Sequence, residues 1–431
     1  LSVRFVPPEL LDLAAASAAD ECAALDDELQ RTMDSWRTWK GRMLLPFAED
    51  PLTCRSALVL KALTYEPTGA MVAAASTSLP ESIGGKRNWD YRYSWVRDSV
   101  LAVRALHVVG IAREADRFRS FIERSAAGSA QQLQVMYGID GKRRLTEVLL
   151  DWLDGYERSR PVRIGNRAAQ QMQLDVYGTL LELAWIWHDA SRPLDPYYWR
   201  FLADVVDTVC RRWQEPNHGI WEFRDRPRHF VHSKAMCWVA LERGCQLARE
   251  HGYEAPLVRW QASRDAVRAA IEQRGYDAQR GVFVQAFDEP HLDAATLLLP
   301  AFGFVDYHDP RMLRTVQALR DELEQGGLLL RYRSPDGFAS AEGVFLPCTF
   351  WLARCLARQG RLDEAWDSYR RAASCANDLG LFPEEYDTAR HRMLGNFPQV
   401  LTHVSQMTAL AALVRAERGA PAGSELRGAG H

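Results

Sequence analysis

The sequence contains no uninterrupted run of about 18 apolar residues, which is roughly the minimum for a transmembrane helix. The net charge is only −3, from 53 basic and 56 acidic residues, so a nucleic-acid-binding or membrane-surface protein is not indicated. No signal-peptide pattern is visible at the N-terminus. These absences predict a cytoplasmic protein with neither nucleic-acid nor membrane partners.

The eight cysteines include no Cys-x-x-Cys pair, and most lie in apolar helical patterns. They are expected to be buried thiols in a reducing compartment. The histidines His229 and His232 lack partners at the spacing of metal ligands. Neither a metal site nor another cofactor is therefore predicted.

What the 431-residue chain has is apolar residues at helical spacing, with few strand signals and a hydrophobic fraction of 47%. Helices are predicted at residues 56–65, 94–109, 112–126, 144–153, 172–190, 196–213, 232–251, 255–273, 292–299, 309–324, 346–358, 362–377 and 401–417. Gly and Pro mark many of the breaks between them. The pair 346–358 and 362–377 is a clear helical hairpin, joined around Gly360.

Consecutive helical hairpins form either an open solenoid or a closed ring of six hairpins, the (α/α)6 barrel. A solenoid repeats one sequence motif at a fixed period, and no such repeat is present. The all-α (α/α)6 barrel is therefore predicted over residues 46–418. Residues 1–45, with a long helix over 8–43, are predicted to be a linker, and residues 419–431 a disordered tail.

Residues 87–99, Arg-Asn-Trp-Asp-Tyr-Arg-Tyr-Ser-Trp-Val-Arg-Asp-Ser, combine four aromatic rings with two carboxylates and three arginines. Aromatic faces cover the C–H faces of a sugar ring, while Arg donates to its hydroxyl oxygens and a carboxylate accepts from its hydroxyl hydrogens. The stretch thus predicts a pocket for a hydroxyl-rich ring. A buried aromatic cluster with paired charges is the alternative.

Two loops offer carboxyl groups for acid–base chemistry. Residues 217–224 place Glu222 beside Trp221, where contact with the ring would favour the protonated carboxyl that a general acid needs. Pairing with Arg224 on an exposed loop is the alternative. Residues 380–387 place Glu384 and Glu385 after Pro383. Such a Glu could act as a general base, or simply stabilise the N-terminus of a helix.

Taken in order, these segments resemble glycoside hydrolase family 15, the glucoamylase and bacterial trehalase family, over roughly residues 56–405. The matching blocks also include Thr77–Glu81, Pro161–Asn166, Gln171–Gly178, Ser233-Lys234, Leu292–Ala295, Arg331-Tyr332, Glu342–Phe345 and Gly395–Gln399. The resemblance implies an (α/α)6 barrel and an inverting enzyme. In bacterial members of the family a β-sandwich domain often precedes the barrel. In this sequence only the helix that would connect the two, at residues 8–43, is expected.

The resemblance also implies roles for single residues. Glu222 would be the general acid and Glu384 the general base, about 6.5–9.5 Å apart to leave room for a water. Substrate-binding positions would be Tyr91, Trp95, Arg97, Asp98, Trp221 and Arg331, with Gln173, Asp175 and His403 as further pocket candidates. The loops at 224–232 and 287–292 are expected to shape the leaving-group side.

The sequence therefore predicts an exo-acting hydrolase that releases β-glucose from a small α-linked glucoside, with trehalose favoured. An isomaltose- or maltooligosaccharide-specific glucohydrolase of the glucoamylase type remains an alternative. So do a disaccharide phosphorylase or polysaccharide lyase, and a degenerate carbohydrate-binding protein. The Pro383-Glu384 loop argues against phosphorolysis, which uses phosphate in place of the water and needs no carboxylate base.

Overall fold

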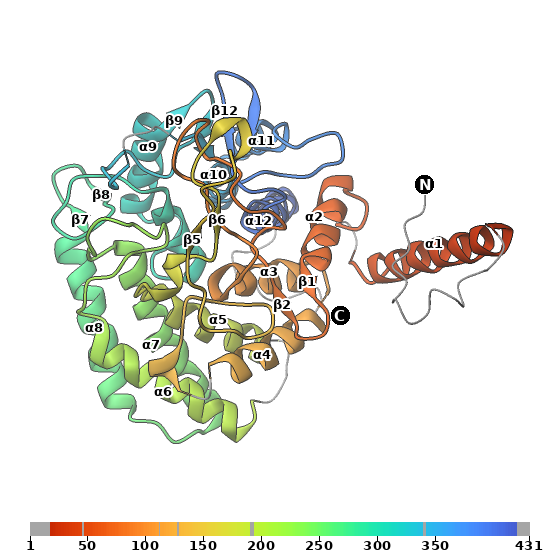
Figure 1. Cartoon of the computed structure of the whole chain (residues 1–431). Helices are drawn as coiled ribbons and strands as arrows, with labels where there is room; N and C mark the ends of the chain where they lie inside the picture. Colours follow the sequence, from red (N-terminus) through yellow and green to blue (C-terminus); the bar gives the residue numbers. More distant parts are fainter. Residues whose placement is uncertain are drawn as a thin grey trace.

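The computed structural model describes residues 18–44, 47–111, 113–126, 129–189, 194–338 and 342–419. Helices dominate these ranges, and they form two concentric rings (Figure 1). The inner ring consists of α3 (Val96–Val108), α5 (Asp175–Asp189), α7 (Val231–His251), η5 (Ala294–Leu298), α10 (Leu346–Arg358) and α12 (Val400–Glu417). The outer ring consists of α2 (Pro51–Ala62), α4 (Arg113–Ser125), α6 (Pro196–Arg212), α8 (Leu257–Arg274), α9 (Pro310–Leu323) and α11 (Leu362–Ala373).

The inner ring is closed. Its members contact one another in chain order, and the last, α12, packs against the first, α3. Each outer helix precedes an inner one in the chain and packs on the outside of the ring. This arrangement confirms the predicted (α/α)6 barrel and excludes an open solenoid.

The two rings differ in how their surfaces are buried. The inner helices α7 and α12 are buried over most of their length, including polar residues such as Lys234 and Gln406. The outer helices α6 and α9 bury one face only, as amphipathic surface helices do. On the inner ring, a side chain at Gly178 of α5 would meet the Met236 carbonyl of α7 at 2.2 Å, so glycine permits their close approach.

Three outer helices begin in the same way. Asp50, Asp195 and Asp309 each accept hydrogen bonds from backbone N–H groups of the first turn, and a proline follows each of them at the first helical position. The aspartate satisfies donors that the helix cannot, and the proline has no N–H to leave unpaired. These Asp-Pro pairs fix where α2, α6 and α9 start.

The strands are short antiparallel ladders in the connecting loops. Their bounds are β1 (Thr64–Tyr65), β2 (Ala70–Met71), β3 (Ser94–Trp95), β4 (Met136–Tyr137), β5 (Val148–Leu149), β6 (Arg163–Ile164), β7 (Tyr276–Asp277), β8 (Val282–Phe283), β9 (Glu324–Gln325), β10 (Leu328–Leu329), β11 (Val344–Phe345), β12 (Glu385–Asp387) and β13 (Arg392–Leu394). In the three-stranded sheet β11-β12-β13, Phe345 pairs with Glu385, and Glu385 with Leu394. Short 3-10 helices η2 (Ala130–Gln132), η3 (Tyr156–Arg158), η4 (Arg167–Gln170) and η6 (Pro300–Phe302) complete the loops.

Two predicted helices are wrong. Residues 144–153 form a loop that contains β5, and most of its apolar side chains are exposed, up to 75% at Trp152, although Leu145 is buried. The helical spacing of these apolar residues therefore does not correspond to the buried face of a helix. Residues 292–299 contain the 3-10 helix η5 in place of an α-helix, and a second 3-10 helix, η6, begins at Pro300 directly after it. The other predicted helices are present, with ends shifted by a few residues.

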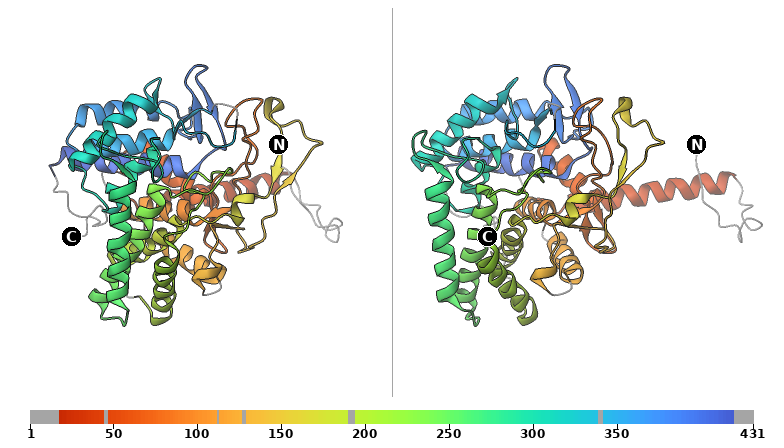
Figure 2. Two further views of the ribbon diagram at one scale, coloured as in Figure 1. Left: turned by 90° about the vertical axis from the view of Figure 1, so that its left-hand side faces the viewer. Right: turned by 60° about the vertical axis from the view of Figure 1, so that its left-hand side comes forward.

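Helix α1 (Ala18–Lys40) projects away from the barrel (Figure 1 and the right-hand view of Figure 2). It forms part of the helix predicted over 8–43; residues 1–17 lie outside the described part of the chain, as do residues 420–431 of the predicted tail. Among the described helices, none has the length and apolar character needed to cross a bilayer. The seven described cysteines are thiols, six of them buried.

Candidate active site

One end of the barrel holds a cavity with about 760 Å³ of empty space, a volume that includes open solvent at its mouth. Its lining comes from loops that are far apart in the chain, including the loops before α3, α7 and α12. Eight of the predicted site residues line it: Tyr91, Trp95, Arg97, Asp98, Trp221, Glu222, Arg331 and Glu384. The structure therefore brings together residues separated by almost 300 positions.

Arg97 and Asp98 lie in the first turn of α3, directly after β3. The Arg97 guanidinium contacts Asp98 at 3.3 Å and Asp175 at 3.2 Å, and donates to Gln173 Oε1 at 3.1 Å. Gln173 and Asp175 are buried and do not line the cavity. They position Arg97 and do not face the cavity, whereas the sequence predicts them to be pocket residues.

Glu222 lies on a loop that is closed at its base by two backbone hydrogen bonds between Asn217 and Arg228, both 2.8 Å. Its backbone adopts the left-handed region, with φ of +59°, which is uncommon for a residue other than glycine. The indole N–H of Trp95 donates to Glu222 Oε1 at 2.6 Å, and Arg97 Nη2 lies 3.7 Å from the same oxygen. An unusual backbone conformation thus directs the carboxylate into the cavity.

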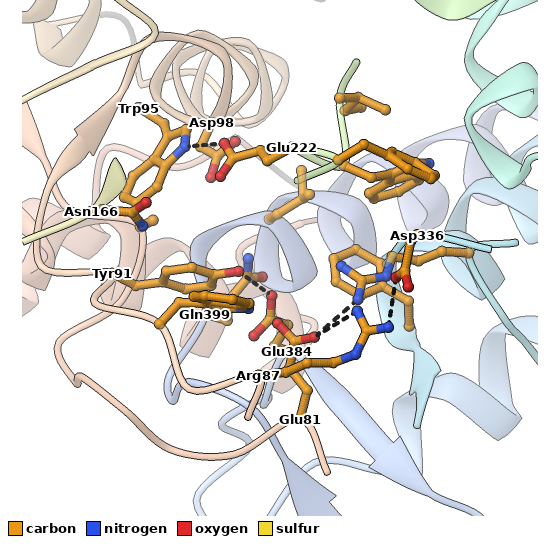
Figure 3. A pocket seen from close by; sticks show the side chains of 18 of the residues that line it. Glu81, Arg87, Tyr91, Trp95, Asp98, Asn166, Glu222, Asp336, Glu384 and Gln399 are labelled. Atoms are coloured by element: carbon orange, nitrogen blue, oxygen red, sulfur yellow. Dashed lines mark hydrogen bonds and ion pairs between the residues drawn. The ribbon is translucent and has the colours of Figure 1, made fainter. Parts of the chain in front are cut away.

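Glu384 lies across the cavity from Glu222 (Figure 3). The Tyr91 hydroxyl donates to Glu384 Oε1 at 2.6 Å, and the side chain is almost completely buried. The Tyr91 and Trp95 rings meet edge to face, with centroids 5.4 Å apart. The two carboxyl groups are therefore connected through a pair of packed aromatic residues, each of which donates to one of them.

The groups around Glu384 shift the pKa of its carboxyl in opposite directions. Burial raises the pKa of Glu384 to about 8, and the neighbouring Glu81 carboxylate adds to the rise. Arg331, the Tyr91 hydroxyl and the Asn396 backbone N–H act in the other direction. The carboxyl group is thus a stronger base than an exposed glutamate, while these donors favour its ionised form.

Behind Glu384 lies a buried group of three carboxylates, Glu81, Glu342 and Glu385, whose oxygens approach within 4.8 Å of one another. Arg331 Nη2 contacts Glu81 at 3.0 Å and Glu385 at 3.1 Å. A guanidinium therefore occupies the position that a cation would take. Arg331 also lines the cavity, although most of its contacts are with these carboxylates.

Trp221 forms the wall beside Glu222. Its indole N–H donates to Asp293 Oδ1 at 2.8 Å, and its ring stacks on Trp351 at a centroid distance of 5.9 Å. Asp293 also caps η5, and burial raises the pKa of its carboxyl to about 6. The short inner-ring helix η5 therefore helps to position Trp221 next to Glu222.

His403 does not line the cavity. Its Nδ1 lies 2.9 Å from the Ser56 hydroxyl and its Nε2 accepts from the Phe382 N–H at 3.1 Å, so it fastens α12 to α2 and to the loop before Glu384. In the loops expected to shape the leaving-group side, Arg224 lines the cavity, whereas Phe287 and Leu292 are buried in the core.

Several residues that line the cavity were assigned no role from the sequence. Arg87 and Trp89 lie within the motif 87–99 and could have been found there. Asp336 and Phe338 carry no sequence signal, and only the fold places them opposite Arg87, whose Nη2 donates to Asp336 Oδ2 at 2.6 Å (Figure 3).

The barrel is shared with known glucoamylase structures. A bacterial glucoamylase complexed with acarbose superposes with a TM-score of 0.71 at 14% identity, covering 91% of this chain and 60% of that one. The glucoamylase from Saccharomycopsis fibuligera gives 0.62 at 13% identity, covering 85% and 94%. These similarities define a helical barrel of the glucoamylase fold.

The family model named glycosyl hydrolases family 15 matches residues 50–411, and the chain belongs to this family. Curated relatives named trehalase include those of Mycolicibacterium smegmatis, 43% identical over 403 residues, and Mycobacterium tuberculosis, 42% identical over 423 residues. The alignments cover 91% and 96% of this chain but 60% of each relative. The chain thus spans about three fifths of the length of these proteins.

Proposed function

We propose that residues 46–418 form the catalytic domain of an inverting, exo-acting α-glucoside hydrolase that prefers trehalose, and that α1 belongs to a linker before it. The observation that carries this proposal is the pair of carboxyl groups, Glu222 and Glu384, on opposite sides of one cavity. Inverting hydrolysis needs two carboxyl groups that flank the bond to be cut.

In this mechanism Glu384 accepts a proton from a water molecule while the water oxygen attacks the anomeric carbon of glucose. The bond from that carbon to the glycosidic oxygen breaks, and Glu222 donates its proton to the leaving oxygen. Attack from the face opposite the leaving group converts an α-glucoside into β-glucose. Tyr91 and Trp95 orient the two carboxyl groups through their hydrogen bonds.

Arg97 and Asp98 are proposed to bind the hydroxyls of the terminal glucose. Both are buried at the closed end of the cavity, and Gln173 and Asp175 support Arg97. A closed end suits an enzyme that removes one terminal sugar. Trp221 and Arg331 complete this part of the wall.

The choice of trehalose is supported by the relatives that are 42–43% identical over more than nine tenths of this chain. Thiols rather than disulfides among the described cysteines support a reducing, cytoplasmic location.

The test is glucose release from trehalose, maltose, isomaltose and a longer α-glucan, compared by kcat/KM. Proton NMR during the first turnovers identifies the anomer. We expect β-glucose and the highest kcat/KM for trehalose. Initial release of α-glucose would contradict the inverting mechanism, and a preference for maltooligosaccharides would assign the enzyme to the glucoamylase type.

A further inference from the structure

The cavity has two ends with different chemistry. Arg97 and Asp98 close the inner end, and only 12% and 9% of their side-chain surface is exposed. At the mouth, the loop that carries Glu222 reaches the surface, and residues 225–227 are exposed. A substrate that enters with its terminal glucose first leaves its second part at the mouth.

Arg224 lines the mouth, two residues after Glu222. Its guanidinium forms a two-pronged ion pair with Glu147, with Nη1–Oε1 and Nη2–Oε2 distances of 3.2 and 3.0 Å. The same group lies over the Trp89 ring, 3.9 Å from its centroid. Arg224 is therefore held in one position by a carboxylate at its edge and by an indole against its plane.

Glu147 is itself fixed. The Arg167 backbone N–H donates to its Oε2 at 3.1 Å, and Arg163 Nε lies 3.4 Å from its Oε1. Although burial alone would raise the pKa of Glu147, the Arg224 guanidinium holds it below its ordinary value. The carboxylate thus stays charged, and it is shared by Arg224 and Arg163.

Arg224 offers the cavity a hydrogen-bond donor. Within the described part of the chain, the Arg224 Nε–H has no protein acceptor, so this donor remains for a ligand oxygen. Sugar hydroxyls supply such oxygens next to the glycosidic bond, whereas an aryl leaving group presents ring carbons there.

We propose that Arg224, positioned by Glu147 and Trp89, is a specificity-determining residue that binds a hydroxyl of the second sugar, on the leaving-group side of the bond. This inference rests on the proposed function, and it names the substrate class as glucosides whose leaving group is a hydroxyl-rich sugar. Arg224 then contributes to cleavage of disaccharides but not of aryl α-glucosides, which present the same terminal glucose to Arg97 and Asp98.

The test compares kcat/KM for trehalose and for 4-nitrophenyl α-glucoside. Arg224→Gln should lower the value for trehalose about 10- to 100-fold, the range of a lost hydrogen bond to a charged group, and leave the aryl glucoside within about threefold. Arg224→Lys keeps the charge but not the planar fork, and should retain at most a part of the trehalose activity. Glu147→Gln should change the same substrate ratio in the same direction, mainly through KM.

Arg226→Gln is the matched control, because Arg226 lies on the same loop but is 74% exposed and does not line the cavity. It should change neither value. Equal losses on both substrates in folded Arg224→Gln and Arg224→Lys would overturn the inference. If the wild-type protein failed to cleave trehalose, the proposed substrate would be wrong; the same ratio, measured with the disaccharide that is cleaved, would still decide the role of Arg224.

Discussion

The two carboxyl groups of the site lie in contrasting surroundings. About 20% of the Glu222 side chain is exposed, on a loop that reaches the surface three residues later. Glu384 is 1% exposed, and it lies beside a buried group of carboxylates joined by Arg331. One carboxyl group therefore lies near solvent, whereas burial, and then fixed neighbouring charges, set the basicity of the other.

This difference matches what an acid and a base must do. A general acid must contact the leaving group and regain its proton after each cycle, so a position near the mouth is useful. A general base needs a raised affinity for a proton and a fixed orientation toward one water molecule. These surroundings are compatible with the proposed roles, Glu222 as the acid and Glu384 as the base.

The strongest test removes each group in turn. Glu384→Ala should lower kcat/KM by about 10²–10⁴-fold on every substrate, because it removes the group proposed to activate the water. Glu222→Gln should cost as much on trehalose but much less on aryl glucosides whose leaving group needs no proton. Glu272→Gln, a change on the outer helix α8 at a side chain 41% exposed, should have no effect. The same response of both variants to the leaving group would contradict the assignment.

The next test displaces the base without removing it. A Cβ at Gly395 would lie 2.6 Å from Glu384 Oε2, and Gly395 also has φ of +73°. Gly395→Ala should lower kcat/KM by about 10²-fold, a loss typical of a misplaced catalytic group. Gly84 is the matched control, because it has φ of +74° with open space around it. Gly84→Ala should cost about 1–2 kcal/mol of stability, measured by urea unfolding, with little change in activity.

The contrast between the surroundings of the two carboxyl groups also shows what can be predicted from the sequence. Glu222 and Glu384 could be found because each lies in a short motif, and the Asp-Pro pairs mark helix starts locally. The ion pairs around the base could not be predicted, although Arg331 was named as a sugar-binding residue, because Glu81, Arg331 and Glu385 are far apart in the chain and meet only when the ring closes.

His403 shows the same limit. Its partner Ser56 is 347 positions away, so nothing in the local sequence indicated that it fastens two helices rather than facing the cavity. The error at residues 144–153 has a different cause. Apolar spacing predicts a helix only where a core covers it, and this segment instead supplies Glu147 to the mouth of the cavity.

A smaller effect is expected in the pH profile. Activity requires ionised Glu384, so kcat/KM falls as pH drops through its pKa, which burial and then Glu81 raise to about 8. This limb should lie above the range of an ordinary glutamate. Glu81→Gln removes one nearby negative charge, so the pKa of Glu384 should fall and the acidic limb should move to lower pH by about one unit.

Glu272→Gln is the control of this experiment, because its side chain lies on the outer helix α8 and is 41% exposed. It should leave the acidic limb in place, whereas Glu81 lies beside Glu384 at the cavity (Figure 3). An acidic limb that stayed fixed in Glu81→Gln, or that moved equally in Glu272→Gln, would show that the carboxylates behind Arg331 do not tune the base.

The smallest expected effect concerns substrate length. If Arg224 ends the binding surface on the Glu222 side, a third glucose unit would lie beyond the cavity, next to the exposed residues 225–227. Longer maltooligosaccharides should then gain less than about tenfold in kcat/KM over maltose, which is less than ~1.4 kcal/mol of transition-state binding. Kinetics on maltose through maltoheptaose measure this. A larger, progressive gain would mean that the mouth binds an extended chain, and would remove the reason for placing the end of the substrate at Arg224.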